Sequence, residues 1–295
     1  MAGFRTEDPT TGEIVRTWDA MSEEQVEDAL AAAQDAFTTW RSTDPVRRAE
    51  VLRRTADLLA QHADELADIA AEEMGKPLAQ GVGEAQLCSQ IFRYYADNAQ
   101  QLLADDALPA HGANSTRVEK EPLGVLLGVM PWNFPIWQVF RFLAPTLMVG
   151  NTALLKHATN VPRCADVIAE VLMAAGVPDG VFGVLHIDNE QAAQVIKDPR
   201  VAAVYTSKSA PQSVVFVANL EPGLAKADQE KASSEVTRRA KAVVGDAGTG
   251  LLRGVVGAEV AHVLRGHALC PGRAHRRKAE GGGKDQRSHG LSFAG

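Results

Sequence analysis

The chain has 295 residues, of which 45% are hydrophobic, and this is enough to bury one large core or two smaller ones. Its net charge of −7 gives no general attraction to nucleic acid or to anionic membranes, so we expect neither as a partner. The N-terminal sequence has no signal-peptide layout, no apolar run reaches the roughly 20 residues of a spanning helix, and three scattered cysteines predict no disulfides, so we expect a cytoplasmic protein.

Three amphipathic helices are predicted in the first hundred residues. The first begins at Ser22, which stands three residues before Gln25 in the spacing of a capping box. The second begins near Pro45, where a missing N–H costs nothing, and ends at Gly75, which suits a left-handed C-cap. The third covers residues 84–103. Its apolar face is predicted to contain Leu87, Ile91, Tyr94 and Tyr95.

From residue 116 the pattern changes to short apolar runs that alternate with helix-like segments. Residues 116–122 alternate in polarity as an exposed strand does. The apolar runs cover residues 123–130, 152–156, 180–187 and 201–206, and the helix-like segments cover residues 138–150, 164–176 and 190–197. This alternation is typical of βαβ units on a parallel sheet. The predicted fold class is therefore α/β, with a Rossmann-like parallel sheet that follows the N-terminal helices.

The composition changes again after about residue 210. Residues 211–295 contain no Ile, Trp or Tyr, and the segment from Arg265 onwards is rich in glycine and basic residues without periodicity. We therefore divide the chain into helices plus a Rossmann-like domain (1–210), a segment of uncertain fold (211–264) and a basic tail (265–295) that we expect to be disordered. The cluster of His262, His267, Cys270 and His275 fits no common zinc-finger spacing, so we predict no metal site.

Two polar side chains end two of the predicted strands. Asn133 lies in the Pro-Trp-Asn-Phe-Pro stretch (131–135) that follows the first apolar run, and Lys156 closes the second. Ligands of doubly wound folds bind at the carboxyl ends of the strands, so both residues are expected at one binding site. Taken alone, the Asn also fits a simple turn and the Lys a solvated strand end.

Six stretches together resemble the aldehyde dehydrogenase superfamily, and within it the succinate-semialdehyde dehydrogenases, whose lysine segment reads Lys-His-Ala. In chain order they are DPTTGEIV, EEMGKPLAQGVGEA, EPLGVLLGVMPWNFPIWQ, GNTALLKHATN, AGVPDGVFGVL and DPRVAAV. They cover about two thirds of the chain, from near residue 8 to near residue 206. The resemblance implies a truncated form of that family's fold.

The resemblance also implies a chemistry and a set of site residues. In the family, a cysteine thiolate attacks an aldehyde, hydride passes to NAD or NADP, and a glutamate activates the water that hydrolyses the thioester. Asn133 matches the residue whose amide stabilises the oxyanion. Thr159 replaces a glutamate of many NAD-specific members, so we expect both cofactors to be accommodated. The positions matched to the cofactor site are Pro131, Trp132, Lys156, His157, Ala158, Thr159 and Ser209.

The chain departs from the family in its second half. Lys208 stands where the family has a glycine before Ser209, and neither the Glu-Leu-Gly-Gly motif nor the Phe-x-x-x-Gly-Gln-x-Cys motif occurs. Cys270 lies beyond the expected spacing. Three hypotheses follow. The first is an NAD(P)-dependent enzyme that oxidises a small aldehyde, expected to be succinic semialdehyde, to the carboxylic acid. The second is an inactive truncated relative that binds nucleotide, a second copy or full-length relatives, and the third is a truncation product that does not fold stably.

Overall fold

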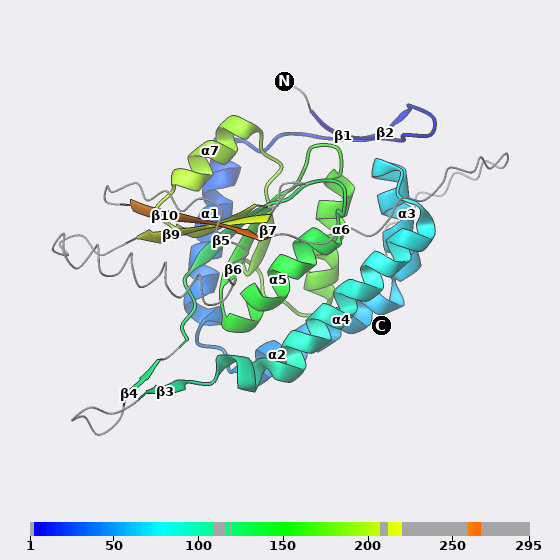
Figure 1. Ribbon diagram of the computed structural model, residues 1–295. Helices are drawn as coiled ribbons and strands as arrows, with labels where there is room; N and C mark the ends of the chain where they lie inside the picture. The colour runs from blue at the N-terminus through cyan, green and yellow to red at the C-terminus, as the bar shows by residue number, and fades with distance from the viewer. Residues whose placement is uncertain (1–2, 109–115, 119, 207–211, 220–258, 267–295) are drawn as a thin grey trace.

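The computed structural model describes residues 3–108, 116–118, 120–206, 212–219 and 259–266. Within these residues, a six-stranded sheet has the strand order β10-β9-β8-β5-β6-β7 (Figure 1). Its strands are β5 (Val125–Val129), β6 (Thr152–Lys156), β7 (Phe182–Val184), β8 (Val201–Thr206), β9 (Gln212–Asn219) and β10 (Glu259–Gly266). Strands β5 to β8 pair in parallel, and β9 and β10 extend the sheet by antiparallel pairing. The predicted α/β class with a parallel sheet is confirmed.

Helices cover both faces of the parallel strands. One face packs against α5 (Trp137–Val149) and α6 (Pro162–Ala174), and the other packs against α1 (Glu23–Trp40) and α7 (Asn189–Lys197) (Figure 1). Every residue of β6 is buried, which explains why its sequence is a continuous apolar run up to the final lysine. The capping box predicted at Ser22 is present at the start of α1.

Three further helices pack against α5 and α6 on the side away from the sheet, and we call them the helical layer. They are α2 (Pro45–Gln61), α3 (Ala63–Met74) and α4 (Leu78–Leu103) (Figure 1). The prediction of a single helix from Pro45 to Gly75 is wrong, because the backbone of His62 (φ −104°, ψ 24°) leaves the helical region and separates α2 from α3. Gly75 ends α3 in the left-handed conformation (φ 70°), as predicted.

The buried face of α4 differs from the predicted one. Leu87 and Tyr94 are 43% and 55% exposed, and the other two predicted residues pack only partly against the core. The buried face contains Gly81, Glu84, Ala85, Cys88, Ser89, Phe92, Ala96 and Ala99. The helices approach so closely that a Cβ atom on Gly81 would lie 2.7 Å from the Ala67 Cβ atom. Close packing therefore explains why most residues of this face are small, with Phe92 and Glu84 as the exceptions.

Two short antiparallel hairpins lie outside the main sheet. They are β1 (Phe4–Glu7) with β2 (Ile14–Trp18), and β3 (Asp106–Leu108) with β4 (Thr116–Val118). The strand predicted over 116–122 is thus confirmed for its first three residues. Residues 265 and 266 belong to β10, and the rest of the predicted tail lies outside the described residues. The proposed division of the chain into domains stays a prediction.

Charged side chains of the helical layer hold α5 and α6 at both ends. Arg48 Nε donates to a carbonyl in the last turn of α5 (3.0 Å), and Arg54 Nε donates to the C-cap carbonyl of α6 (2.8 Å). At the opposite ends, the carboxylates of Glu84 and Glu73 accept hydrogen bonds from the first N–H groups of α5 and α6. Each charge complements the helix dipole at its end. These contacts therefore stabilise the packing of the helical layer against α5 and α6.

Candidate functional site

The structure brings the 131–135 turn and Lys156 to the same edge of the sheet, which we call the carboxyl edge. Strands β5 and β6 are parallel neighbours, and Val129 stands opposite Lys156 in the register. Met130 N donates to the Lys156 carbonyl at 3.1 Å, so the turn that contains Asn133 begins beside the last residue of β6. The alternating sequence pattern predicted this juxtaposition.

Two residues, one in the α3–α4 connection and one on α4, hold the Asn133 turn in place. Lys76 Nζ donates to the Asn133 carbonyl at 2.9 Å and pairs with Glu84 at 2.6 Å. Glu84 Oε1 accepts from the N–H groups of Ile136 and Trp137 at 2.8 and 2.7 Å, and so caps α5, which has no side-chain cap of its own. The Asn133 Oδ1 atom is buried and has no hydrogen-bond partner among the described residues.

The lysine segment is more buried than a surface ligand would be. Lys156 is 7% exposed, its Nζ atom donates to the His157 carbonyl (3.3 Å), and burial lowers its pKa. His157 Nδ1 accepts from Ala158 N (2.8 Å), which assigns the ring proton to Nε2, and Nε2 donates to Pro135 O (2.9 Å). Burial lowers the pKa of His157 to about 4. Both ring nitrogens are thus engaged within the chain, and the imidazole ties the lysine segment to the turn.

A cavity of about 580 Å³ opens beside both motifs. Trp132 lines it from the turn, Thr159 and Asn160 line it from the lysine segment, and Arg5 and Glu7 line it from β1. The side chains of Trp132 and Thr159 are exposed to it, whereas Pro131 and Ala158 are half-buried. Ser209 lies outside the described residues. Whether these positions contact a cofactor stays a prediction.

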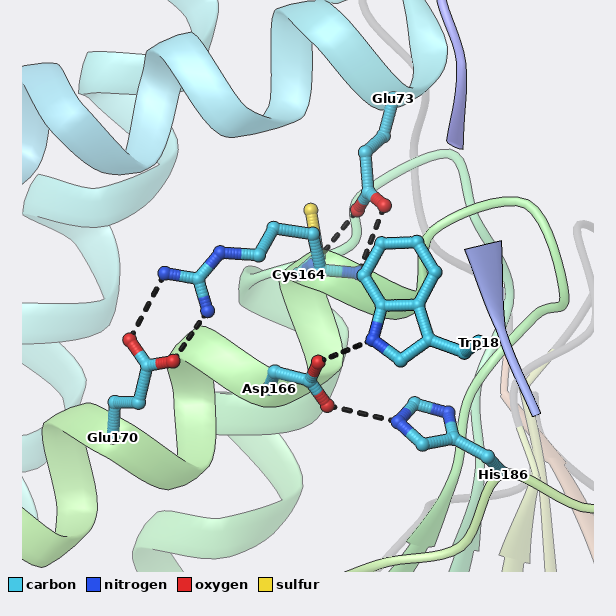
Figure 2. Close-up of polar contacts among 7 residues, drawn as sticks. Trp18, Glu73, Cys164, Asp166, Glu170 and His186 are labelled. Atoms are coloured by element: carbon cyan, nitrogen blue, oxygen red, sulfur yellow. Dashed lines mark hydrogen bonds and ion pairs between the residues drawn. The ribbon is translucent and has the colours of Figure 1, made fainter. Parts of the chain in front are cut away.

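Carboxylates already occupy the helix N-termini at this edge. Glu73 reaches α6 from α3 and accepts from Arg163 N at 2.8 Å and from Cys164 N at 2.7 Å (Figure 2). It also accepts from Thr6 Oγ1 at 2.6 Å. Burial raises the pKa of the Glu73 carboxyl. Asp188 caps α7 in the same way, at 2.9 Å from two backbone N–H groups. Glu84 of α4 caps α5 in the same way. A carboxylate therefore occupies each of the three described helix N-termini at the carboxyl edge, and none is open to a phosphate.

The β1–β2 hairpin, whose first strand and turn line the cavity, is anchored to α6. The Trp18 indole N–H donates to one oxygen of Asp166 at 2.7 Å, and His186 Nε2 lies 2.8 Å from the other oxygen (Figure 2). The ring of Phe4 also contacts His186, with 5.5 Å between centroids. The hairpin therefore has a defined position next to the carboxyl edge.

Comparison with known proteins places this arrangement in a family. The model of the aldehyde dehydrogenase family matches residues 2–212. The chain belongs to the aldehyde dehydrogenase family. It is 46% identical over 220 residues to succinate-semialdehyde dehydrogenase [NADP(+)] 1 of Mycobacterium tuberculosis, a match that covers 73% of this chain and 48% of the relative. A probable succinate-semialdehyde dehydrogenase [NADP(+)] of Synechocystis is 43% identical over 211 residues, covering 72% and 46%. This aldehyde dehydrogenase chain thus spans about half the length of these relatives.

Solved structures show the same fold over a similar share of the chain. The succinic semialdehyde dehydrogenase of Streptococcus pyogenes in complex with NADP+ matches with a TM-score of 0.67 and 36% identity, over 69% of this chain and 45% of that one. The succinate-semialdehyde dehydrogenase of Burkholderia pseudomallei matches with a TM-score of 0.66 and 35% identity, over 70% and 43%.

The described thiols of this aldehyde dehydrogenase chain are not suited to nucleophilic attack. Cys88 and Cys164 are fully buried, and burial raises the pKa of both. Cys270 lies outside the described residues. Across the described ranges, no three His, Cys, Asp or Glu side chains gather as a metal site would require. None of the helices in that part of the chain combines the length and apolar character needed to cross a membrane.

Arg141, on α5, is a candidate site residue that the sequence analysis did not single out. Its Nη2 atom donates to Gln138 Oε1 (2.9 Å) and to the Tyr205 hydroxyl (2.6 Å), and its guanidinium lies 4.3 Å from the centre of the Trp137 ring. The Nε atom is buried without a hydrogen-bond partner, and no carboxylate of the described residues pairs with this side chain. A single charge within the apolar sequence of α5 was the signal that could have identified it.

Proposed function

We propose that this chain binds NAD or NADP at the carboxyl edge and takes part in the oxidation of a small aldehyde, succinic semialdehyde, to the carboxylic acid. The observation that carries this proposal is the meeting of the Asn133 turn and the Lys156 segment beside one cavity. Relatives that are named as NADP-dependent succinate-semialdehyde dehydrogenases support both the cofactor and the substrate.

Three residues at the carboxyl edge would contact the dinucleotide. Lys156 would contact the adenosine ribose, and Trp132 and Thr159 would line the same ligand from two sides of the cavity. Because Thr159 is uncharged, it would not repel the 2′-phosphate of NADP. The helix N-termini of α5, α6 and α7 are capped by carboxylates, so the pyrophosphate would be bound elsewhere.

Asn133 would act on the substrate. Its side-chain amide donates hydrogen bonds without a proton that can be lost, so it can stabilise the oxyanion that develops on the aldehyde oxygen. Removal of one such donor typically costs about 10²–10³ in rate. When bound, the nicotinamide supplies the acceptor for a hydride.

Arg141 would bind the substrate carboxylate. The guanidinium has no acidic partner in the described part of the chain, and its buried Nε–H is a donor that a carboxylate could satisfy. Arg141 lies on α5 and Asn133 directly precedes that helix, so one element positions both groups. This arrangement supports an aldehyde that carries an acid group over an uncharged aldehyde.

The second candidate function is nucleotide binding without turnover. It is favoured by the burial of both described thiols and by the lack of a Glu-Leu-Gly-Gly motif in the sequence. Such a chain would associate with a second copy or with full-length relatives. The exposed apolar side chains of Leu87 and Tyr94 on α4 support such an association.

The test is to purify the chain, measure NADPH and NADH formation with succinic semialdehyde, and measure the thermal shift that NADP and NAD produce. Turnover supports the enzyme, and a thermal shift without turnover supports the second function. A folded chain that shows neither turnover nor a thermal shift would overturn both candidate functions.

Matched variants locate the binding and the chemistry. Lys156→Met should remove the thermal shift, whereas Lys197→Met, at the end of α7, should keep it. Asn133→Ala should lower turnover, whereas Asn98→Ala, on the exposed side of α4, should not.

A further inference from the structure

The proposed function depends on the Asn133 amide, whose direction no hydrogen bond within the described part of the chain fixes. Its Oδ1 atom is buried and has no partner among the described residues. The orientation of the amide is therefore set by where the backbone of the 131–135 turn is held. Three contacts from outside the turn hold that backbone: Lys76 at the Asn133 carbonyl, His157 at the Pro135 carbonyl and Glu84 at the first N–H groups of α5.

Two of these three residues form a buried ion pair. The side chains of Lys76 and Glu84 are 3% and 2% exposed, and Nζ lies 2.6 Å from Oε2. Nζ also lies 3.9 Å from the centre of the Phe134 ring, so the ammonium contacts two consecutive residues of the turn. Burying two charges is costly, and an apolar pair of similar volume often serves stability as well or better. Stability alone therefore does not explain this pair.

We infer that Lys76 and Glu84 are positioning residues for the oxyanion donor Asn133. Glu84 fixes the start of α5 through Oε1 and, through Oε2, holds the Lys76 side chain in its buried position. Lys76 then fixes the carbonyl of Asn133, and thereby the direction of its side-chain amide. Both residues act through Asn133 and contact neither substrate nor cofactor. The inference rests on the proposed function for its catalytic meaning, but the geometry it describes can be tested without turnover.

Three variants separate positioning from stability. Lys76→Met leaves a buried carboxylate unpaired, so the melting temperature should fall. Lys76→Met/Glu84→Gln is neutral and keeps an acceptor for the α5 N–H groups, so the melting temperature should recover. Arg48→Met, at the far end of α5, is the control for destabilisation of that helix without a change at the turn.

The readout is the side-chain NH₂ signal of Asn133 in ¹H–¹⁵N spectra, assigned by its loss in Asn133→Asp. We expect this signal to be displaced or broadened in the double variant and unchanged in Arg48→Met. A double variant with a recovered melting temperature and an unchanged Asn133 signal would overturn the inference. If Lys76→Met does not fold, the double variant still decides the outcome.

A separate measurement distinguishes failure of the proposed function from failure of the positioning inference. Titration of the unmodified chain with NADP, followed by tryptophan fluorescence, reports cofactor binding through the exposed ring of Trp132. A displaced Asn133 signal with no NADP binding would support the positioning role and contradict the proposed function. If the unmodified chain turns over substrate, the double variant should lower kcat by at least tenfold with little change in KM.

Discussion

Burial sets the chemistry of the His157 side chain, whose imidazole is enclosed between β6 and the 131–135 turn. Its neutral form donates to the Pro135 carbonyl and accepts from the next backbone N–H, so a second ring proton would have no place. The same burial that lowers its pKa therefore makes the turn sensitive to acid. A histidine in the same motif but exposed to solvent would not have this property.

We predict that His157 destabilises the fold as the pH falls from 6.5 to about 4. In this window the unfolded chain binds a proton at His157 and the folded chain does not. The contribution to stability is therefore fully present above the unfolded pKa of 6.5 and is lost as the pH approaches about 4, by roughly 3 kcal/mol. Urea unfolding at successive pH values across the window measures this loss.

The variant His157→Gln isolates the effect. Burial raises the pKa of Glu73, which gives a pH dependence of the opposite sign, so the slope of the unmodified chain mixes the two residues. Gln keeps a donor for the Pro135 carbonyl and does not titrate. Its stability should depend less on pH in this window, and parallel curves for the two proteins would contradict the prediction.

Thr159 provides a second prediction for a single residue, which rests on the proposed function. Thr159→Glu places a carboxylate on the exposed cavity wall, where it would repel the 2′-phosphate of NADP. We expect the dissociation constant for NADP to rise by about tenfold, equivalent to about 1.4 kcal/mol, with a smaller change for NAD. Fluorescence titration with both cofactors measures this difference. Thr159→Gln is the uncharged control, and equal weakening by Gln and Glu would exclude an electrostatic cause.

At the scale of elements, α6 depends on a carboxylate that belongs to α3. Helix α6 has no N-cap side chain of its own, and Glu73 accepts from two of its first N–H groups (Figure 2). Glu73 also accepts from the Thr6 hydroxyl. The sequence of α6 therefore begins without a local start signal other than Pro162. Helices α5 and α6 share this dependence on the helical layer.

We predict that Glu73→Ala lowers the free energy of unfolding by about 2–3 kcal/mol, because it leaves buried N–H groups and the Thr6 hydroxyl without an acceptor. Glu73→Gln should cost less, since an amide oxygen can replace one carboxylate oxygen. Chemical denaturation of both variants measures the difference. Glu72→Ala changes the exposed neighbour and serves as the control, and an equal loss from Glu72→Ala would contradict the capping role.

At the scale of the whole molecule, the helical layer and the sheet share one hydrophobic core. Leu59 of α2, Phe92 of α4, Phe140 of α5 and Leu155 of β6 belong to the same buried cluster. The charged caps at both ends of α5 and α6 connect the same elements. A sheet separated from this layer would lose apolar contacts and helix caps together.

We predict that the helical layer and the parallel strands unfold as one unit. Leu59→Ala removes a fully buried side chain of α2 and should cost about 2–5 kcal/mol. Hydrogen exchange of β5 and β6 amides should accelerate in proportion. Leu87→Ala truncates an exposed leucine of the same layer and should leave exchange nearly unchanged. Unaltered protection of β5 and β6 in Leu59→Ala would show that the two parts unfold separately.

Local sequence patterns were sufficient for a large part of this structure. The alternation of apolar runs and helices, the caps at Ser22 and Gly75, and the location of Asn133 and Lys156 at neighbouring strand ends all depend on residues close together in the chain. These features follow from hydrophobic periodicity and backbone preference, which need no knowledge of distant contacts.

Contacts between distant segments decided the rest. The buried face of α4, the carboxylates that cap α5 and α6, and the enclosed His157 ring arise where residues up to 91 positions apart meet. Hydrophobic periodicity favoured the large residues Leu87 and Tyr94 for the core, but the buried face of α4 consists mostly of small residues around Phe92. Lys76 and Glu84 could not be recognised as partners of Asn133, because the ion pair exists only once α4 lies against the 131–135 turn.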